Sequence, residues 1–367
     1  MGDFLARAWE VLTRRIDSFL FGCALALVGV GLVTLFSASD QSVARVTTQL
    51  FSFGFALVLM WMVANIAPQT LARAAVPLYV LGVVLLVGVA LFGVVVNGSR
   101  RWLNLGFARI QPSELMKIAV PLMLAWYFQK FEGRINWKDF AVAAVLIVVP
   151  VYLIKRQPDL GTALLIAASG FYVLYLAGLS WKIIVGLVAF AGATGPYVWA
   201  HLHDYQRERI LTFIDPARDP LGTGYHSTQA SIAIGSGGVI GKGWLNGTQT
   251  HLDFLPERRT DFIFAVFGEE FGLIGNGLLL VLYMLLIGRA MVITANASTL
   301  FARLMAGAVT LMFFTYAFVN MGMVSGLLPV VGVPLPLVSY GGTALVSLFI
   351  GLGILMSVQA HRKLVTT

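Results

Sequence analysis

Charged residues are scarce in this chain, since Asp, Glu, Lys and Arg make up 11% of its 367 residues. A soluble domain usually carries about a quarter, so this composition excludes an ordinary soluble protein. Apolar residues account for 58% of the chain, and the mean hydropathy is +0.85. We therefore expect an integral membrane protein built as one bundle rather than as a row of soluble domains.

Cysteine is nearly absent, and Cys23 alone can form neither a disulfide framework nor a cysteine-rich metal site. The sequence has no His-Glu-x-x-His zinc motif, and the glycine-rich IGSGGVIGKGW lacks the spacing of a phosphate loop or a dinucleotide fingerprint. His201 and His203 stand close together without an obvious third ligand, so no metal site is predicted. No Asp-x-Asp pair is present, which disfavours a nucleotide-sugar donor. A glycosyl donor, if one is used, is expected to come from the membrane.

The sequence is rich in long apolar runs. A membrane-spanning helix needs about 20 mostly apolar residues. Ten stretches meet this requirement, at residues 16–38, 46–66, 74–95, 112–129, 138–155, 161–179, 182–200, 262–288, 300–325 and 340–359. The predicted fold is an all-α polytopic membrane protein, a single domain over residues 1–367. One long extracytoplasmic loop, about residues 201–261, separates spans seven and eight. The halves do not mirror each other as they do in many secondary transporters.

The distribution of basic residues predicts the orientation. With the N-terminus in the cytoplasm, the inner loops hold twelve Lys and Arg residues, whereas the short outer loops hold six, namely Arg45, Arg100, Arg101, Arg109, Lys155 and Arg156. Cytoplasmic loops are normally the richer in such residues, so both termini are predicted to be cytoplasmic. The outer arginines, with Arg207 and Arg209 of the long loop, suit an anionic ligand such as a phosphate. Ordinary surface charge on a long loop is the alternative explanation.

Ionisable residues inside apolar spans are costly and are functional candidates by default. Glu114 and Lys117 lie three residues apart, on one face of the fourth predicted span, where they can pair. The pair is either functional or a self-neutralising packing device. Asp159 stands at the start of the sixth span, where it could simply cap the helix. Glu269 and Glu270 are adjacent, about 100° apart around a helix, so at most one is expected to face a cavity well.

Asp261 is the sharpest candidate for chemistry. It lies in ERRTDFIFAV, where a basic run meets the start of an apolar helix at the outer interface. A helix-capping role would also explain an acid at this point. The residues alone leave both roles open.

Five long motifs occur in order along nearly the whole chain, namely NGSRRWLNLGFARIQPSELMKIA, RQPDLGT, ERILTFIDPARDPLGTGYHSTQASIAIGSGG, LPERRTDFIFAVFGEEFG and LPLVSYGGT. Together they resemble the motifs of the SEDS family (shape, elongation, division and sporulation) of peptidoglycan glycosyltransferases. The segment GKGWLNGTQTHLDFLPER is similar to the RodA branch rather than the FtsW branch. Arg259 stands where many relatives have His, which keeps a cation beside Asp261.

The resemblance implies a ten-span enzyme that polymerises lipid II, an undecaprenyl-pyrophosphate-linked disaccharide peptide, into glycan strands during elongation and rod-shape maintenance. It implies Asp261 as the essential acid, and Glu114, Lys117 and Asp159 as parts of a functional cavity. It also implies that the protein lies in the bacterial inner membrane with its active site facing the periplasm. The implied partners are a class B penicillin-binding protein transpeptidase, the elongation machinery and membrane lipids. No nucleic-acid partner is expected.

Elementary chemistry agrees with this expectation. Joining two sugars requires a base that takes the proton of the acceptor hydroxyl, for which Asp261 is the candidate. The pyrophosphate leaving group needs cations, for which Arg100, Arg101, Arg109, Arg207 and Arg209 are candidates. A divalent ion such as Mg²⁺ could share this role. Two alternatives remain: a flippase that moves lipid II outward, which needs access from both leaflets, and a scaffold that tolerates substitution of Asp261.

Overall fold

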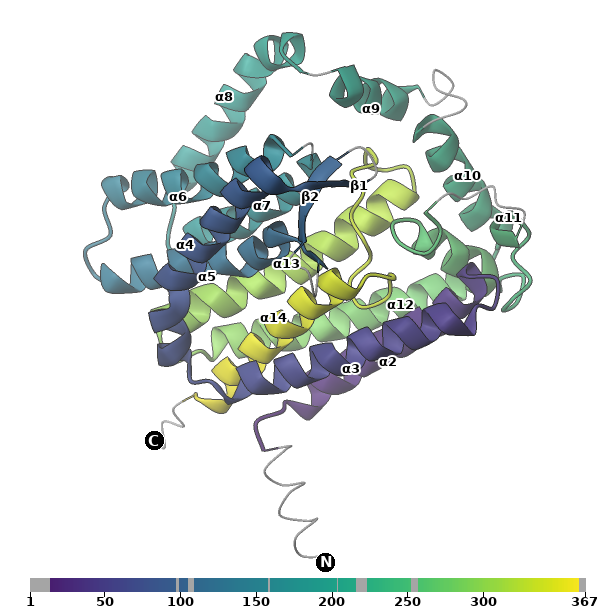
Figure 1. Cartoon of the computed structure of the whole chain (residues 1–367), viewed down its shortest axis with the longest axis horizontal. Helices are drawn as coiled ribbons and strands as arrows, with labels where there is room; N and C mark the ends of the chain where they lie inside the picture. Colours follow the sequence, from purple (N-terminus) through teal and green to yellow (C-terminus); the bar gives the residue numbers. More distant parts are fainter. Residues whose placement is uncertain are drawn as a thin grey trace, which may run out of the picture.

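The computed structural model describes residues 14–96, 99–104, 109–157, 159–202, 204–215, 223–251 and 257–362. Within these ranges the regular secondary structure is helical apart from three short strands (Figure 1). The first helices are α2 (Ser18–Ala38), α3 (Val43–Asn65), α4 (Pro68–Phe92), α5 (Pro112–Lys130), α6 (Trp137–Lys155), α7 (Leu160–Leu176) and α8 (Trp181–Ala200). They are followed by α9 (Asp204–Ile214), α10 (Thr223–Ser236), α11 (Thr248–His251), α12 (Ile263–Ala295), α13 (Leu300–Val324) and α14 (Gly342–Ala360).

All ten predicted spans coincide with helices, namely α2 to α8 and α12 to α14. Seven of these are long and apolar enough to cross a membrane, and α7 is a shorter apolar helix. The main differences lie at helix ends. Helix α4 begins at Pro68 because proline fits the first turn, and α12 continues to Ala295, seven residues beyond the prediction. The predicted all-α membrane fold is confirmed.

A small antiparallel sheet was not predicted. Strands β1 (Val94–Val96), β2 (Ser99–Asn104) and β3 (Arg109–Ile110) lie between α4 and α5 in the order β1-β2-β3. The register pairs Val94 with Trp102 and Leu103 with Ile110. Strand β3 leads directly into α5, so it places Arg109 beside the first turn of that helix.

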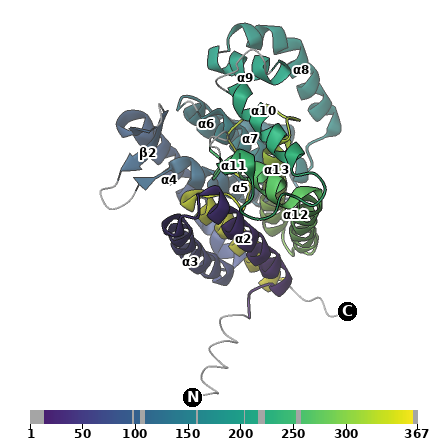
Figure 2. The same ribbon diagram turned by 90° about the vertical axis from the view of Figure 1, so that its right-hand side faces the viewer.

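Helices α13 and α14 form the centre of the bundle. Both are 67% buried over their most apolar windows, whereas α3 is only 17% buried. Helix α14 packs against α3 and α13, and α12 packs against α2 and α13. Helix α7 covers another side of α13, and α4 and α6 flank α5. Figure 2 shows α2 and α3 side by side along one flank of this core.

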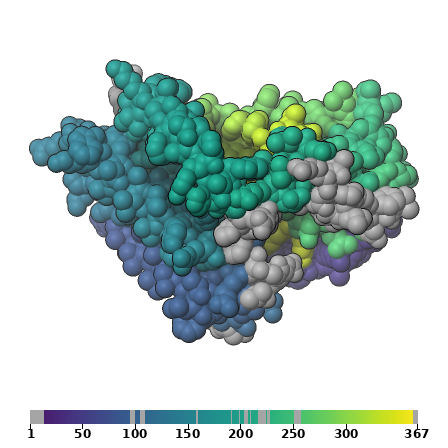
Figure 3. Space-filling model, turned by 90° about the horizontal axis from the view of Figure 1, so that it is seen from above, coloured from purple at the N-terminus to yellow at the C-terminus, as the bar shows by residue number. Residues whose placement is uncertain are grey.

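The predicted long loop of residues 201–261 is partly helical, because it contains α9, α10 and α11. Helix α8 extends away from the bundle, and α9 and α10 lead back to it (Figures 1 and 2). From above, Figure 3 shows this part as a teal-to-green ridge in front of the yellow C-terminal part. Helix α10 packs on α12 and α13, and its Ala230 and Ala233 are fully buried.

Helix α12 is broken at Gly272, whose φ of 64° and ψ of −161° are not helical. The glycine-rich residues 237–243 fill the break. The N–H groups of Lys242 and Gly243 donate to the carbonyls of Glu269 and Glu270, each at 3.0 Å. In return, the N–H groups at 273 and 274 donate to residues 238 and 239. Backbone groups freed at a break inside an apolar bundle must find such partners, so this glycine-rich motif is structural.

Candidate active site

Asp261 lies in the turn before α12 and is partly exposed. Helix α12 begins at Ile263 with Phe262 at the N-cap position, so Asp261 stands one residue ahead of the cap. The first turn of α12 contains no acidic residue. This geometry does not support the alternative that Asp261 serves only as the helix cap.

Two buried polar side chains hold the backbone around Asp261. Asn320 Nδ2 of α13 donates to the carbonyls of Asp261 at 2.8 Å and of Val333 at 2.6 Å. Ser339 Oγ donates to the Thr260 carbonyl at 2.6 Å. Asn320 is fully buried and Ser339 is 6% exposed. The carboxylate therefore stands on a backbone that is fixed by two separate parts of the chain.

The arginines just before Asp261 tie this turn to the end of α2. Arg258 Nη2 lies 2.6 Å from Asp40 Oδ2, and Arg259 Nη2 lies 3.7 Å from the same oxygen. Arg259 Nε also donates to the Ala38 carbonyl at 3.3 Å. Arg258 is 5% exposed, so its charge is used within the protein. These contacts make α2 a third support for the turn.

A short irregular segment, residues 331–333, lies close to both Asp261 and the start of α7. Gly332 has a φ of +72°, and a Cβ there would lie 3.3 Å from Asp261 Oδ2. On the other side, a Cβ at Gly161 of α7 would meet the Val331 carbonyl at 2.6 Å. Gly332 needs glycine because of its positive φ, whereas Gly161 needs it because a Cβ would meet the Val331 backbone. The segment thus lies close to Asp261 and to α7, the helix that begins just after Asp159.

Glu114 and Lys117 form the predicted pair in α5, with Lys117 Nζ 2.6 Å from Glu114 Oε1. The other carboxylate oxygen accepts a hydrogen bond from Ser347 Oγ of α14 at 2.7 Å. Lys117 is 3% exposed and lies 5.1 Å from the centre of the Tyr316 ring of α13. The predicted pairing is confirmed, and it joins three helices.

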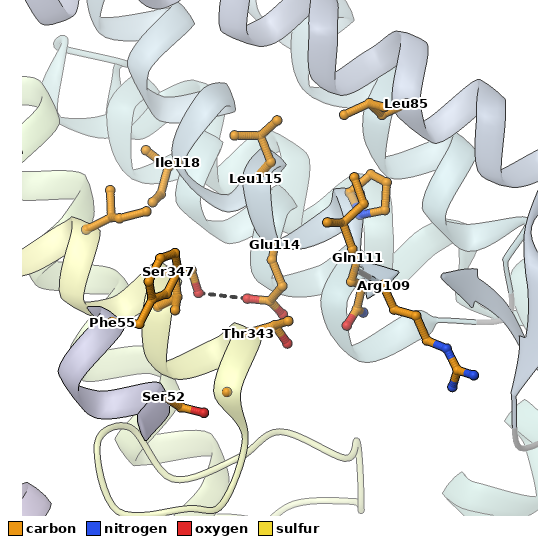
Figure 4. Close-up of a pocket in the computed structure, with 15 residues that line it drawn as sticks. Ser52, Phe55, Leu85, Arg109, Gln111, Glu114, Leu115, Ile118, Thr343 and Ser347 are labelled. Carbon is orange, nitrogen blue, oxygen red and sulfur yellow. Dashed lines mark hydrogen bonds between the residues drawn. The ribbon is translucent and has the colours of Figure 1, made fainter. Parts of the chain in front are cut away.

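A cavity of about 590 Å³ opens beside Glu114. In Figure 4, Glu114 reaches into it from α5, with Ser347 opposite and Arg109 pointing away at one edge. Its walls are mainly apolar and include Phe55 of α3, Leu85 of α4, and Leu115 and Ile118 of α5. Ligand sites often combine such walls with a few placed polar groups. The apolar walls can therefore accept an apolar chain, and Arg109 places a cation at the edge of the cavity.

Asp159 is the N-cap of α7, where its Oδ1 accepts a hydrogen bond from the Thr162 N–H at 3.1 Å. The structural alternative predicted for this residue is therefore confirmed. Its Oδ2 also lies 3.6 Å from Arg101 Nη1 of β2. Asp159 consequently links the small sheet to α7, and it positions Arg101 near the Asp261 end of the bundle.

The remaining predicted arginines do not gather at one point. Arg100 is exposed and donates to the Ala90 carbonyl at 3.4 Å. Arg207 donates to the carbonyls of Trp199 and Ala200 at the end of α8, at 3.0 and 2.6 Å. Arg209 belongs to α9, but its side chain lies outside the described part of the structure. Among the predicted arginines whose side chains the structure describes, only Arg101 and Arg109 lie beside other predicted site residues.

Glu269 and Glu270 are both buried, which agrees with the expectation that at most one of them would face a cavity. Glu269 Oε1 binds Lys242 Nζ at 2.7 Å and accepts from the Gln249 N–H at 2.9 Å. Glu270 accepts a hydrogen bond from Ser37 of α2. These carboxylates hold the α10–α11 segment and α2 against the broken part of α12.

The described residues include no cluster of three or more His, Cys, Asp or Glu that could hold a metal ion. His201 instead packs on Tyr197, at a ring-centre distance of 4.2 Å, and contacts its carbonyl. His203 lies outside the described residues.

Comparison with known proteins identifies the family. The FTSW_RODA_SPOVE family of cell cycle proteins matches residues 17–364. The chain therefore belongs to the FtsW, RodA and SpoVE family of membrane proteins, as the SEDS motifs indicated.

Individual relatives are similar along nearly the whole chain. Peptidoglycan glycosyltransferase MrdB of Escherichia coli K12 is 50% identical, covering 96% of this chain and 95% of that protein. A probable peptidoglycan glycosyltransferase FtsW of Thiomicrospira cyclica is 34% identical, covering 98% and 96%. The predicted enzyme class, a peptidoglycan glycosyltransferase, is thus confirmed, and the higher identity lies on the RodA side.

Solved structures agree. A chain from a peptidoglycan synthase complex that coordinates polymerisation and crosslinking superposes with a TM-score of 0.83 at 34% identity, covering 95% of this chain and 98% of that one. The Thermus thermophilus rod shape determining protein RodA gives a TM-score of 0.71 at 31% identity, covering 95% and 97%.

Sequence reasoning missed the side chains that support the candidate residues. Asn320, Ser339 and Ser347 are ordinary polar residues in or beside apolar helices, and nothing in their spacing predicts their partners. The Pro/Gly-rich stretch LLPVVGVPLPLVSYGG, residues 327–342, was the one available signal, because it is too broken for a regular helix. It supplies both Gly332 and Ser339.

Proposed function

We propose that this chain polymerises lipid II into glycan strands during cell elongation and rod-shape maintenance, with Asp261 as the general base. One observation carries the proposal: a partly exposed acid stands at the start of α12 on a backbone fixed by Asn320 and Ser339. A general base must be held in place so that it meets the acceptor hydroxyl.

We assign the cavity beside Glu114 to one lipid-linked substrate. Its apolar walls suit the isoprenoid chain, and Arg109 at its edge suits the pyrophosphate. As the bond to the sugar breaks, negative charge grows on the leaving pyrophosphate, and fixed cations stabilise that charge. Arg101 and Arg109 are the candidates that the geometry favours. Lys117 keeps the Glu114 charge neutralised inside the bundle.

The proposed setting is the bacterial inner membrane, with both termini in the cytoplasm and Asp261 facing the periplasm. The proposed partner is a class B penicillin-binding protein that crosslinks the new strands within the elongation machinery. The similar chain from a peptidoglycan synthase complex supports such a partner.

A divalent ion such as Mg²⁺ is a separate part of the proposal. Mg²⁺ usually keeps several waters and binds through substrate phosphates and one or two carboxylates, so we place it on the pyrophosphate. Polymerisation measured in EDTA, and again after Mg²⁺ is added back, tests this. Full activity in EDTA would remove the ion from the mechanism.

The decisive test is polymerisation of purified lipid II by the intact chain and by Asp261→Asn, which keeps the shape but cannot accept the proton. Each is assayed with its partner, whose acyl-transfer site is blocked. We expect long glycan from the intact chain and a loss of at least about 100-fold in the variant, because general bases contribute about 10²–10⁴-fold. Glu132→Gln, an exposed carboxylate after α5, is the matched control and should retain activity.

Equal activity in the intact chain and Asp261→Asn would place the base elsewhere. If neither forms glycan while the protein moves lipid II across vesicle membranes, the flippase alternative replaces the polymerase.

A further inference from the structure

A second cavity, of about 250 Å³, lies where α4 begins and α5 ends. These helices pack side by side (Figure 1). The lining residues are Gln69, Ala72 and Arg73 of α4, and Trp126, Gln129 and Lys130 of α5. None of them belongs to the candidate active site.

Helical spacing gathers the polar groups of this cavity. Gln69 and Arg73 are four residues apart on α4, and Trp126 and Lys130 are four apart on α5, so each pair shares a face. Lys130 Nζ lies 5.5 Å from the centre of the Trp126 ring. Arg73 and Lys130 are both exposed. Within the described residues, no carboxylate lies within ion-pair distance of either cation.

The cavity lies at the opposite end of α5 from Glu114. The 19 residues of α5 span about 28 Å at 1.5 Å per residue, close to the roughly 30 Å thickness of a bilayer's hydrocarbon core. Glu114 belongs to the first turn and Lys130 to the last. The cavity is therefore at headgroup depth on the membrane face remote from Asp261.

We infer that this cavity binds the phosphodiester headgroup of an anionic phospholipid. The Arg73 guanidinium can form two hydrogen bonds to a phosphodiester, and Lys130 adds a second positive charge. The amides of Gln69 and Gln129 can bind the glycerol or phosphate oxygens, and the Trp126 ring suits the membrane interface. Basic pockets between membrane helices on the cytoplasmic side recognise such lipids. That the leaflet is cytoplasmic rests on the proposed orientation, whereas the binding itself does not.

The test measures phosphatidylglycerol binding to the purified full-length chain in detergent by native mass spectrometry. The double variant Arg73→Gln with Lys130→Gln should weaken binding by about 30-fold, because two juxtamembrane cations act on one phosphate. The matched control is Lys182→Gln with Arg303→Gln, two exposed cations outside the cavity, and it should bind as the intact chain does. Arg73→Lys with Lys130→Arg keeps both charges and should retain most of the binding.

Two further arms identify the ligand. Phosphatidylcholine, which has a phosphodiester but no net charge, should bind at least about tenfold more weakly. Inorganic phosphate at millimolar concentration should not displace phosphatidylglycerol. Equal loss in the cavity and control pairs would overturn the proposal, as would equal binding of phosphatidylcholine. Displacement by inorganic phosphate would make this a free-anion site instead. None of these readouts depends on polymerisation.

Discussion

At the scale of single residues, Glu114 and Lys117 show how much local spacing can predict. Their three-residue separation was enough to predict the ion pair. It could not predict the hydrogen bond from Ser347, which comes from another helix far along the chain. Asp261 was identified as a candidate because it stands just ahead of an apolar helix. Its hydrogen-bond partners Asn320 and Ser339 are distant in the sequence, and no sequence pattern predicts them.

The buried pair allows a stability prediction. Lys117→Met leaves the Glu114 carboxylate in an apolar bundle without its cation, which should cost about 3–5 kcal/mol of unfolding free energy. Adding Glu114→Gln to the same chain should restore most of that loss, because no charge then remains to be compensated. Unfolding in SDS titrations of the intact, single and double variants measures this.

Lys182→Met, at an exposed position, is the control and should change the unfolding free energy by less than about 0.5 kcal/mol. If the double variant were as unstable as Lys117→Met, uncompensated charge would not be the cause.

Asp17, just before α2, gives a pH dependence. Burial would raise the pKa of its carboxyl, but hydrogen bonds from Arg289 and the Leu20 N–H, with the Arg289 charge, lower that pKa below its ordinary value of 3.8. Arg289 Nη2 lies 2.5 Å from Asp17 Oδ2. A lowered folded-state pKa stabilises the protein above the unfolded pKa, and the stabilisation disappears as pH falls through the folded pKa.

We therefore expect Asp17→Asn to lower the thermal unfolding midpoint at pH 7, by the equivalent of about 2 kcal/mol for a charged hydrogen bond. The difference between the two chains should shrink below pH 3.8. Thermal unfolding of both chains across pH 3–7 is the measurement. A difference that is constant over this range would assign the effect to shape rather than charge.

At the scale of elements, the sequence predicted the ten spans because length and apolarity determine a membrane helix. It did not predict the small sheet or the helices between α8 and α12. Apart from β1, which is three valines, their composition is polar or rich in glycine, which is typical of loops. Their structure depends on packing: α10 is held by α12, and residues 237–243 by the break in α12 at Gly272. Such partners are not visible in local composition.

Gly241 tests the role of this glycine-rich segment. Its φ is +84°, and a Cβ there would lie 2.1 Å from the Glu270 carbonyl oxygen. Gly241→Ala should therefore lower the unfolding free energy by more than about 3 kcal/mol, since left-handed strain and a backbone clash combine. SDS unfolding titrations provide the measurement.

Substitutions at two other glycines separate the effect of backbone strain from the effect of the clash with α12. Gly238 has a φ of +56° with no atom within 4 Å of a Cβ, so Gly238→Ala should show only the strain, about 1–2 kcal/mol. Gly186 of α8 also has open space around it, and Gly186→Ala should be neutral or stabilising. Equal effects at 241 and 238 would mean that the close approach to α12 contributes nothing.

At the scale of the whole molecule, the candidate site is a convergence of distant segments. The turn before α12 is held by α13, by the stretch before α14 and, through Asp40, by the end of α2. The family resemblance picked out these segments, because several of the family's motifs occur in order along the chain. Physical reasoning from one sequence could not place them together, since each contact joins residues whose separation is set by the whole fold.

Orientation is the whole-molecule prediction that follows from charge. Both ends of the chain are predicted in the cytoplasm, which puts the turn after α2 outside and the turn after α5 inside. Gln41 and Glu132 are exposed in these turns, and the native Cys23 is 8% exposed. In a Cys23→Ala background, Gln41→Cys should react with a membrane-impermeant thiol reagent once the outer membrane is permeabilised. Glu132→Cys should react only after the inner membrane is opened.

We expect this labelling pattern because Lys and Arg residues of short loops are retained on the cytoplasmic side. The arginines around Asp261 are instead held by ion pairs within the protein. Arg101, one of the six cations counted on the outer side, is paired with Asp159, so it carries less weight in the orientation than a simple count suggests. Labelling in the reverse order would place Asp261 in the cytoplasm, where strands destined for the wall could not be assembled directly. It would leave the fold intact and shift the proposed function toward transport of the lipid-linked precursor.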